Sequence, residues 1–435
     1  MKRLAFVCGL VFVVVVPSWA SRLEDAGAKW AGGDKAGAVA VWRAIVEDST
    51  DPKEVTAARM KLANACWAAG DVSSAVAQWQ AVAAGAAEPA MLAESKLRLA
   101  NATVKSSAPI ADQIAAFLRV ANEHPNAPQA GQCLLRAAYL RDKAEPKAGA
   151  AAFGEVVSRY PGTKEAAEAS YRKGLVLERK RADIDGAIDA LALAAATVKA
   201  GPMLRQQALV EAGYARIMKY MGSALEVDLK AAAEYFKETL PRLSNPDLAA
   251  RALLGLGECY LLSEKFPIKN EPPTAADLAE QEARDAEHYA VQAEKAYQFA
   301  LSTQCSDYVK VLAQYGVAYS LMRQDRWEEA AAAFGKVLSA IPGESLCQKR
   351  DNWRKLAVAK ASTGSIAASG LHVEWKHLVV MAAYWRGDCL DSAERKAEAR
   401  AVFQQIVDEF GHEENPHCFV RAAERALAEM AGGAG

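Results

Sequence analysis

The stretch that decides the fold is Gly33-Asp34-Lys35-Ala36-Gly37-Ala38-Val39-Ala40-Val41-Trp42, because its pattern returns 37 positions later. In the second copy, Gly70-Asp71 leads through Ala75 to Trp79. A further pattern, a phenylalanine followed eight positions later by proline, begins at Phe117, Phe153 and Phe334. Self-similarity at a period in the thirties indicates stacked helical hairpins, each of which buries its apolar face against its neighbours.

Each repeat is predicted to contain two helices joined by a tight turn. Glycine supplies left-handed backbone at the turn, and the following aspartate caps the second helix. In that helix, alanine and the aromatic residue four positions later share one face, so we expect the aromatic side chain to be buried. The first helices carry a glycine, as at Gly257 and Gly316, which allows close approach of a neighbouring helix. Helical periodicity continues through nearly the whole chain, which predicts an all-α fold, an α-solenoid of stacked antiparallel helix pairs.

Composition and motifs restrict the function. The net charge of −1 gives no basic footprint for nucleic acid. The sequence contains no HExxH, GxSxG or phosphate-binding GK[ST] motif, and Ser170-Tyr171-Arg172-Lys173 matches a serine–lysine spacing only by chance within a repeat helix. We therefore predict no enzymatic activity, no cofactor, no metal and no nucleic-acid partner.

The N-terminus has the pattern of an export signal. Lys2 and Arg3 precede an apolar run from Leu4 to Val16, and small residues at positions 18 and 20 predict cleavage after Ala20. The run is shorter than the roughly 20 residues that span a bilayer. We expect residues 1–20 to be removed, no membrane span in the mature chain, and a periplasmic location, with secretion as the alternative.

The repeat pattern divides the chain into segments. Proline-rich residues 264–276 are predicted to form an inserted loop, and residues 277–302 one long helix. Residues 343–370 are predicted to form a second inserted loop, and Pro416 to Met430 an amphipathic capping helix. The predicted organisation is signal peptide 1–20, N-terminal array 21–263, loop 264–276, central units 277–342, loop 343–370, C-terminal unit with cap 371–430 and flexible tail 431–435.

Cysteine and histidine residues offer two alternatives to simple packing. The seven cysteines that follow the export signal are scattered, and most lie in apolar helical patterns where a thiol packs as a small hydrophobic group. Cys305 and Cys347 flank one hairpin and are the alternative disulfide pair. A cluster near the C-terminus favours a solvated turn, with a soft-metal site as the alternative; its members are His412, Glu413, Glu414, His417 and Cys418.

Together these signatures resemble the tetratricopeptide repeat, in which W-x-x-L-G-x-x-Y is followed by an alanine, an aromatic residue and a terminal proline. The resemblance extends over residues 22–430 and is clearest at 57–89, 128–162 and 307–343. The first-helix tryptophan is absent, and residues 183–245 follow the pattern poorly. The segment from Phe153 to Tyr171 is also similar to repeats of periplasmic envelope-assembly and cell-division-coordinator proteins. The resemblance implies a right-handed superhelix.

The resemblance also implies a function, namely binding of a protein or peptide in a groove formed by the first helices. The alternatives are a helical accessory domain of an envelope glycan-processing enzyme and a structural, self-assembling spacer; self-association is possible in any case. The Lys/Asn set with which family members bind a peptide's C-terminal carboxylate is not evident. Each candidate groove residue has packing between repeats as its alternative role. The candidates are Asn64, Trp67, Tyr171, Glu178, Arg251, Glu258, Lys310, Tyr384 and Asp388.

Overall fold

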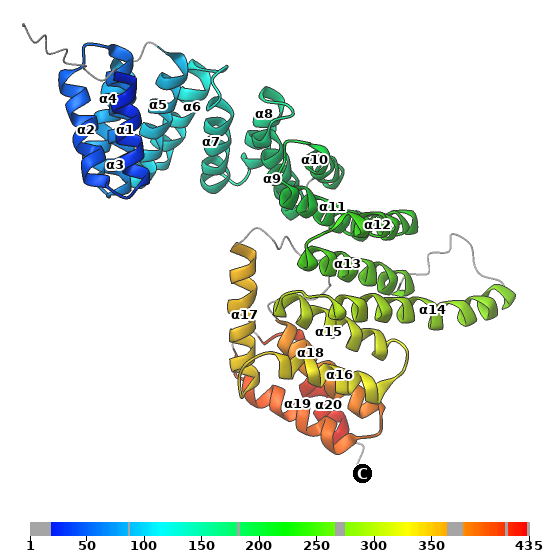
Figure 1. The fold of residues 1–435 in the computed structure, drawn as a ribbon. Coiled ribbons are helices and arrows are strands. Elements are labelled where there is room, and N and C mark those ends of the chain that lie inside the picture. Colours follow the sequence, from blue (N-terminus) through cyan, green and yellow to red (C-terminus); the bar gives the residue numbers. More distant parts are fainter. Residues whose placement is uncertain are drawn as a thin grey trace, which may run out of the picture. The chain divides into compact units, whose positions relative to one another are not determined.

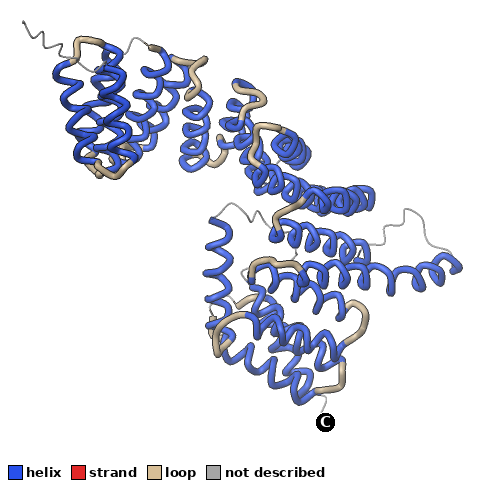
Figure 2. Tube along the Cα trace, viewed as in Figure 1, coloured by secondary structure: helices blue, strands red, loops and turns tan. Residues whose placement is uncertain are grey.

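The computed structural model describes residues 19–85, 88–180, 183–265, 275–362, 377–413 and 416–432. These residues form twenty α-helices and one short 3-10 helix, joined by turns, with no strand among them (Figures 1 and 2). Helices that follow one another in sequence pack against each other in pairs. The predicted all-α class and solenoid of helix pairs are therefore confirmed.

The chain divides into two compact units, residues 1–160 and 161–435, and each is described by itself. The sequence pattern did not indicate a division at this position. In the first unit, each odd-numbered helix is the first helix of a repeat and each even-numbered helix is the second. Its helices are α1 (Trp19–Ala31), α2 (Lys35–Asp48), α3 (Pro52–Ala68), α4 (Val72–Gly85), α5 (Pro89–Lys105), α6 (Ile110–Glu123), α7 (Ala130–Ala144) and α8 (Gly149–Arg159).

The second unit continues the same alternation up to α16. In this unit the first helices of successive repeats also contact each other. The contacting pairs are α9 with α11, α11 with α13, and α13 with α15. Its helices are α9 (Lys164–Lys180), α10 (Ile184–Ala196), α11 (Pro202–Ser223), α12 (Glu226–Thr239), η1 (Leu240–Arg242), α13 (Pro246–Lys265), α14 (Ala275–Ser302), α15 (Asp307–Met322), α16 (Trp327–Ala340), α17 (Leu346–Ser362), α18 (Leu378–Ser392), α19 (Lys396–Phe410) and α20 (Cys418–Gly432).

The turns within the hairpins form as the sequence predicts. Gly33 and Gly70 adopt φ values of 91° and 84°, the left-handed region that disfavours other residues. A carboxylate oxygen of Asp34 accepts a hydrogen bond from the Gly37 amide at 2.9 Å and so caps α2. Asp71 accepts from the Ser74 amide at 3.0 Å in the next repeat. These bonds satisfy amides that the first turn of a helix leaves without a partner.

The repeated aromatic side chains form the centre of each hairpin. Trp42 is 3% exposed and Trp79 1%, and the alanines four positions before them are fully buried. Phe334 of α16 is likewise buried. Helices α6, α8 and α16 end before the prolines that follow them, since proline cannot continue a helix. The predicted packing role of these residues is confirmed.

The glycines inside the first helices allow close helix packing, as predicted. A Cβ atom on Gly257 of α13 would lie 2.7 Å from Tyr297 Cζ, and one on Gly316 of α15 would lie 2.5 Å from Tyr297 Cδ1. The ring of Tyr297, on α14, is therefore held between the backbones of two first helices. Any side chain at either glycine would displace it.

The first predicted insertion lies only partly within the described residues. Helix α13 continues to Lys265, α14 begins at Ala275, and residues 266–274 are outside the described part. The predicted long helix over 277–302 is confirmed by α14 (Figure 1). Of the predicted export signal, residues 1–20, positions 1–18 are also outside the described part, and α1 begins at Trp19. The tail is outside from residue 433 onward.

The second predicted loop, 343–370, is wrong over most of its length, because residues 346–362 form helix α17. The prediction failed because this segment lacks the repeat signatures, although Trp353 is completely buried. The Trp353 ring stacks on Tyr308 of α15 with a centroid distance of 4.8 Å and an interplanar angle of 7°. Helix α16 packs directly on α18, so α17 is an additional helix beside the hairpin order. Residues 363–370 are outside the described part.

The C-terminal helix that was predicted from Pro416 to Met430 is present as α20, which begins at Cys418. It packs against α19 and α18 and so covers the last hairpin of the second unit. Its buried residues, Val420 and Ala423, join the same apolar core as α15 to α19.

Candidate functional site

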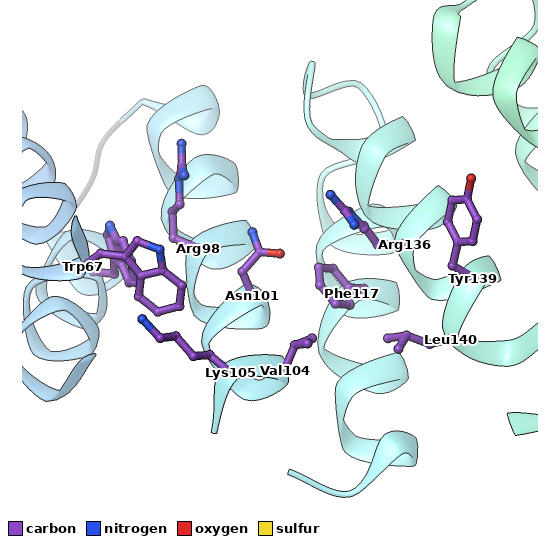
Figure 3. Close-up of a pocket in the computed structure, with 10 residues that line it drawn as sticks. Trp67, Arg98, Asn101, Val104, Lys105, Phe117, Arg136, Tyr139 and Leu140 are labelled. Carbon is purple, nitrogen blue, oxygen red and sulfur yellow. The ribbon is translucent and has the colours of Figure 1, made fainter. Parts of the chain in front are cut away.

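A pocket of about 390 Å³ opens in the first unit between the first helices of three successive repeats, α3, α5 and α7. Helices α4 and α6 contribute its floor. In Figure 3, side chains of α5 face those of α7 across the pocket, with Phe117 between them. The lining residues are Trp67, Trp79, Arg98, Asn101, Val104, Lys105, Phe117, Arg136, Tyr139 and Leu140.

The aromatic floor and walls of the pocket are held by packing within the repeats. Trp79 and Phe117 are 1% exposed and belong to the hairpin cores. The Trp67 ring lies 5.4 Å from that of Trp79, and Tyr139 contacts Phe153 edge-on at 5.3 Å. Such tilted and edge-on arrangements are favourable for aromatic pairs. The pocket is therefore built on side chains that the fold itself fixes.

The pocket wall carries three cations, and none of its ten lining residues is acidic. Lys105 Nζ lies 4.4 Å from the centroid of the Trp67 ring, a cation–π contact. Arg98 donates from Nε to Glu94 Oε1 at 2.7 Å, and its Nη2 lies 2.7 Å from the same oxygen. The exposed Arg136 makes no ion pair to the described residues. The wall thus has a positive charge that the surrounding described residues only partly neutralise.

The lining residues offer groups that can bind a partner. They comprise three cations, one amide and six carbon-rich side chains. What the arrangement offers is an apolar surface beside several hydrogen-bond donors.

The structure places the nine predicted groove residues in different environments. Trp67 lines the pocket, and the exposed Asn64 lies one turn before it on α3. Lys310 is exposed and lies 3.6 Å from Asp307. Tyr384 and Asp388 are half-buried on α18, where the Tyr384 ring contacts Phe419 at 5.0 Å. Burial raises the pKa of Asp388, and the nearby Asp391 raises it further.

The other four candidates are buried and so are not presented to a partner in this structure. Tyr171, Glu178 and Glu258 are 2% exposed and Arg251 is 5% exposed. They lie on α9 and α13, which both pack against α11. The alternative role that the sequence allowed for them, packing between repeats, matches this placement. A surface role was expected because charged side chains are rarely buried.

These residues belong to a buried polar cluster in the second unit. Arg251 Nη2 donates to Glu211 Oε1 at 2.8 Å, and the Tyr214 hydroxyl donates to the Arg251 carbonyl oxygen at 2.7 Å. Burial raises the pKa of Glu178, the Glu211 carboxylate adds to the shift, and Arg251 opposes it. Burial also raises the pKa of Glu211, against the effect of Arg251.

Residues 25–90, 276–345 and 374–414 match the tetratricopeptide-repeat family. The chain contains tetratricopeptide repeats in these three segments. No curated protein matches it. Solved structures similar to it include a human IFIT1 dimer with m7Gppp-AAAA (14% identity, 89% of this chain and 80% of that chain, TM-score 0.36) and the P58(IPK) TPR domain (14%, 95% and 99%, TM-score 0.24). Another is a monomeric IFIT1 mutant with Gppp-AAAA (13%, 95% and 90%, TM-score 0.35).

Sequence reasoning missed most of the pocket. Arg98, Asn101 and Lys105 succeed one another along α5, and Arg136 follows on α7. Their spacing of three or four residues on a first helix was the available signal, since such residues share a face. The segment that matches the tetratricopeptide-repeat family ends at residue 90, and α5 lacks the first-helix glycine pattern, so this repeat did not stand out.

Four of the seven cysteines in the described residues are buried, and Cys418 is exposed. All seven cysteines in the described residues are free, so the alternative pair Cys305–Cys347 is not formed. Burial raises the pKa of the Cys133 and Cys389 thiols to about 12.

In the C-terminal cluster, Glu413 pairs with Arg350, and His417 stacks on His377 with a centroid distance of 4.1 Å. Glu414 lies outside the described residues. No group of three metal-ligating side chains occurs where the structure describes the chain. Among the described helices, none has the length and apolar character needed to cross a membrane.

Proposed function

We propose that this tetratricopeptide-repeat protein is an exported scaffold that binds another protein in the cell envelope and performs no catalysis. The observation that carries the proposal is the pocket between α3, α5 and α7, because it combines rigid aromatic side chains with hydrogen-bond donors on three successive first helices. Interfaces gain most of their binding energy from a few such aromatic and arginine residues. The export signal predicted from the sequence supports the proposed location.

A protein partner fits this surface better than a nucleic acid does. Nucleic-acid affinity depends mainly on many contacts between basic residues and phosphates. The whole chain has 52 basic and 53 acidic side chains, and the pocket contributes only three of the basic ones. The exclusion of nucleic acid remains a prediction. The RNA-like ligands of the IFIT1 structures belong to those proteins.

The test is site-specific photo-crosslinking in cells of the organism that encodes the protein. A photoreactive residue replaces Val104, which is 44% exposed in the pocket, or Arg119, which is exposed on the second helix α6 and serves as the control. We expect one protein to crosslink from position 104 and not from position 119. Crosslinks to copies of the same chain alone would instead support the self-assembling spacer.

Location is tested separately. Fractionation followed by N-terminal sequencing should find the chain outside the cytoplasm and beginning at Ser21. A full-length chain that remains in the cytoplasm would contradict the proposed export without affecting the crosslinking result.

A further inference from the structure

The pocket in the first unit has a polar end and an apolar end. In the view of Figure 3, Arg98 and Arg136 lie in the upper half of the pocket, whereas Val104 and Leu140 lie in the lower half beside Lys105, whose ammonium contacts the Trp67 ring. Phe117 lies between the two walls. An occupant that satisfies both ends must carry an anionic group and an apolar group a short distance apart.

The polar end favours a carboxylate. Arg98 uses Nε and Nη2 toward Glu94, and its Nη1 makes no bond to the described residues. Arg136 on the opposite wall makes no ion pair to them either. Guanidinium groups bind carboxylates through strong, charge-assisted hydrogen bonds. Glu94 compensates Arg98 only from outside the pocket, and no lining residue is acidic, so an anionic group of an occupant would meet no like charge among the lining residues.

The apolar end favours a large hydrophobic side chain. Val104 is 44% exposed, which is unusual for an aliphatic side chain within a pocket wall, and the Phe117 and Leu140 side chains line the same space. Burial of apolar surface contributes about 25 cal/mol per Å², so covering these side chains makes such a contact favourable. The volume of about 390 Å³ is near the lower end of ligand pockets, so it suits a pair of side chains better than a whole helix.

The faces of the pocket tryptophans are already used, which argues against a stacked nucleobase. Lys105 Nζ lies 4.4 Å above the Trp67 ring, and Trp79 packs against the same residue at 5.4 Å. Nucleic-acid bases bind single-strand sites mainly by stacking on open aromatic faces. A base would have to displace Lys105 before it could stack on Trp67.

We propose that this pocket binds an internal, extended segment of the partner protein in which an aspartate or glutamate lies within two positions of an aromatic or large aliphatic residue. The proposal rests on the proposed function and specifies the partner's chemistry. The carboxylate contacts Arg98 and Arg136, while the hydrophobic side chain packs on Val104, Leu140 and Phe117. Side chains two positions apart in an extended segment point to the same side, so both can enter one pocket and each can reach a different end of it.

The experiment is selection of a random peptide library displayed on phage with the full mature chain as bait. Displayed peptides are joined to the phage at their C-terminus, so only internal carboxylates are available. Parallel baits carry Arg136→Glu, Val104→Ser or the control Arg119→Glu, a charge reversal of an exposed arginine outside the pocket. The wild-type and Arg119→Glu baits should enrich peptides that carry the acidic–hydrophobic pair.

Binding of the best peptide is then measured by fluorescence polarisation. We expect Arg136→Glu to weaken binding at least about tenfold, since it removes a charged partner of a desolvated carboxylate. Replacement of the peptide's acidic residue by its amide should give a similar loss. Val104→Ser should relax the preference for the hydrophobic residue, and amidation of the peptide's C-terminus should change nothing.

Four outcomes would overturn the proposal. Two concern the selection: enrichment of peptides without an acidic residue, and enrichment that Arg136→Glu leaves intact. Two concern binding: dependence of peptide binding on a free C-terminal carboxylate, and binding of a fluorescent single-stranded RNA that is tighter than peptide binding and is abolished by Arg136→Glu. If peptides of another chemistry are enriched, or if Val104 crosslinks a protein whose bound segment lacks the pair, the proposed function stands and only this inference fails. Crosslinking that captures no other protein would remove the proposed function itself.

Discussion

Arg251 and Glu211 form an ion pair in the interior of the second unit, with Arg251 Nη2 lying 2.8 Å from Glu211 Oε1 and the two side chains 6% and 0% exposed. Glu178, on the adjacent first helix α9, lies within the field of both groups. Moving charges out of water costs several kcal/mol per ion, so the Arg251 guanidinium is required to compensate the buried Glu211 carboxylate. The stacking of α9, α11 and α13 therefore depends on Arg251.

The first prediction concerns this ion pair. Arg251→Met should destabilise the second unit by about 3–5 kcal/mol, because it leaves Glu211 buried without its partner. The double variant Glu211→Leu/Arg251→Met should recover most of that loss. The measurement is urea denaturation, followed by amide hydrogen exchange in α11 and α13.

The matched control is Lys230→Met, which breaks an exposed ion pair with Glu226 on α12. Exposed pairs of this kind contribute about 0.2–1 kcal/mol. Equal losses of stability in Lys230→Met and Arg251→Met would show that the buried pair has no special role. If the double variant were as unstable as Arg251→Met alone, packing volume rather than charge would set the cost.

The second prediction concerns pH. Burial raises the pKa of Glu178, so between its unfolded and folded pKa values the native state holds a proton that the unfolded chain has released. Stability therefore falls as pH rises through that window, starting near the unfolded value of about 4.3. Glu178→Gln keeps the shape without titrating. It should flatten this decline and raise stability above the window, because a side chain that does not ionise avoids the cost of a buried charge.

Urea midpoints across the window test the effect, with Glu234→Gln as the control on the exposed face of α12. Glu234→Gln should leave the pH dependence as in the wild type. If Glu178→Gln lost stability at every pH, the carboxylate would be ionised and bound in the native state, contrary to this prediction.

Local requirements explain which parts of this structure the sequence could predict. Glycine before aspartate in a turn, alanine four positions before an aromatic residue and proline after a helix each satisfy a need within one hairpin, so Gly70, Trp79 and Pro342 were interpreted correctly. The burial of Glu178 and Arg251 depends on the packing of three helices, α9, α11 and α13, that are far apart in sequence. The identity of a single charged residue does not indicate such burial, because charged side chains are mostly exposed. The pocket residue Arg136 was missed for the same reason, because its neighbours across the pocket come from α5.

The third prediction concerns the turn between α18 and α19. Glu394 adopts φ of 59° there, in the left-handed region, and its side chain is 85% exposed. The left-handed conformation costs an L-residue roughly 1–2 kcal/mol, a cost that glycine avoids. Glu394→Gly should therefore stabilise the second unit by about 1 kcal/mol, measured as a shift of the urea midpoint.

The equivalent turn of the first unit supplies the reverse change, since Gly70 has φ of 84°. Gly70→Ala should destabilise that unit by about the same 1 kcal/mol. A neutral Glu394→Gly would indicate that the flexibility glycine adds to the unfolded chain cancels the relief of strain.

The fourth prediction compares two glycines inside helices of the second unit. At Gly316 an added Cβ would lie 2.5 Å from the ring of the fully buried Tyr297, whereas at Gly335 the nearest atom is Arg386 Nε at 3.7 Å. Gly316→Ala should cost about 1–3 kcal/mol through overpacking. Gly335→Ala should gain about 0.5–1 kcal/mol because alanine favours the helix. Thermal unfolding of the two variants should give shifts of opposite sign, and stabilisation by both would mean that Tyr297 can move aside.

The last prediction tests whether α17 belongs to the folded core. The Trp353 ring is completely buried and stacks on Tyr308 of α15, so this one side chain joins a helix outside the repeat order to the hairpin array. Trp353→Ala should cost about 3–5 kcal/mol, and faster hydrogen exchange should appear first in α17 and α15. Lys355→Ala, two positions along the same helix and exposed, is the control and should leave exchange unchanged. Equal exchange in both variants would show that α17 folds onto the array without this contact, and its other contacts with α18 and α19 would then be what holds it in place.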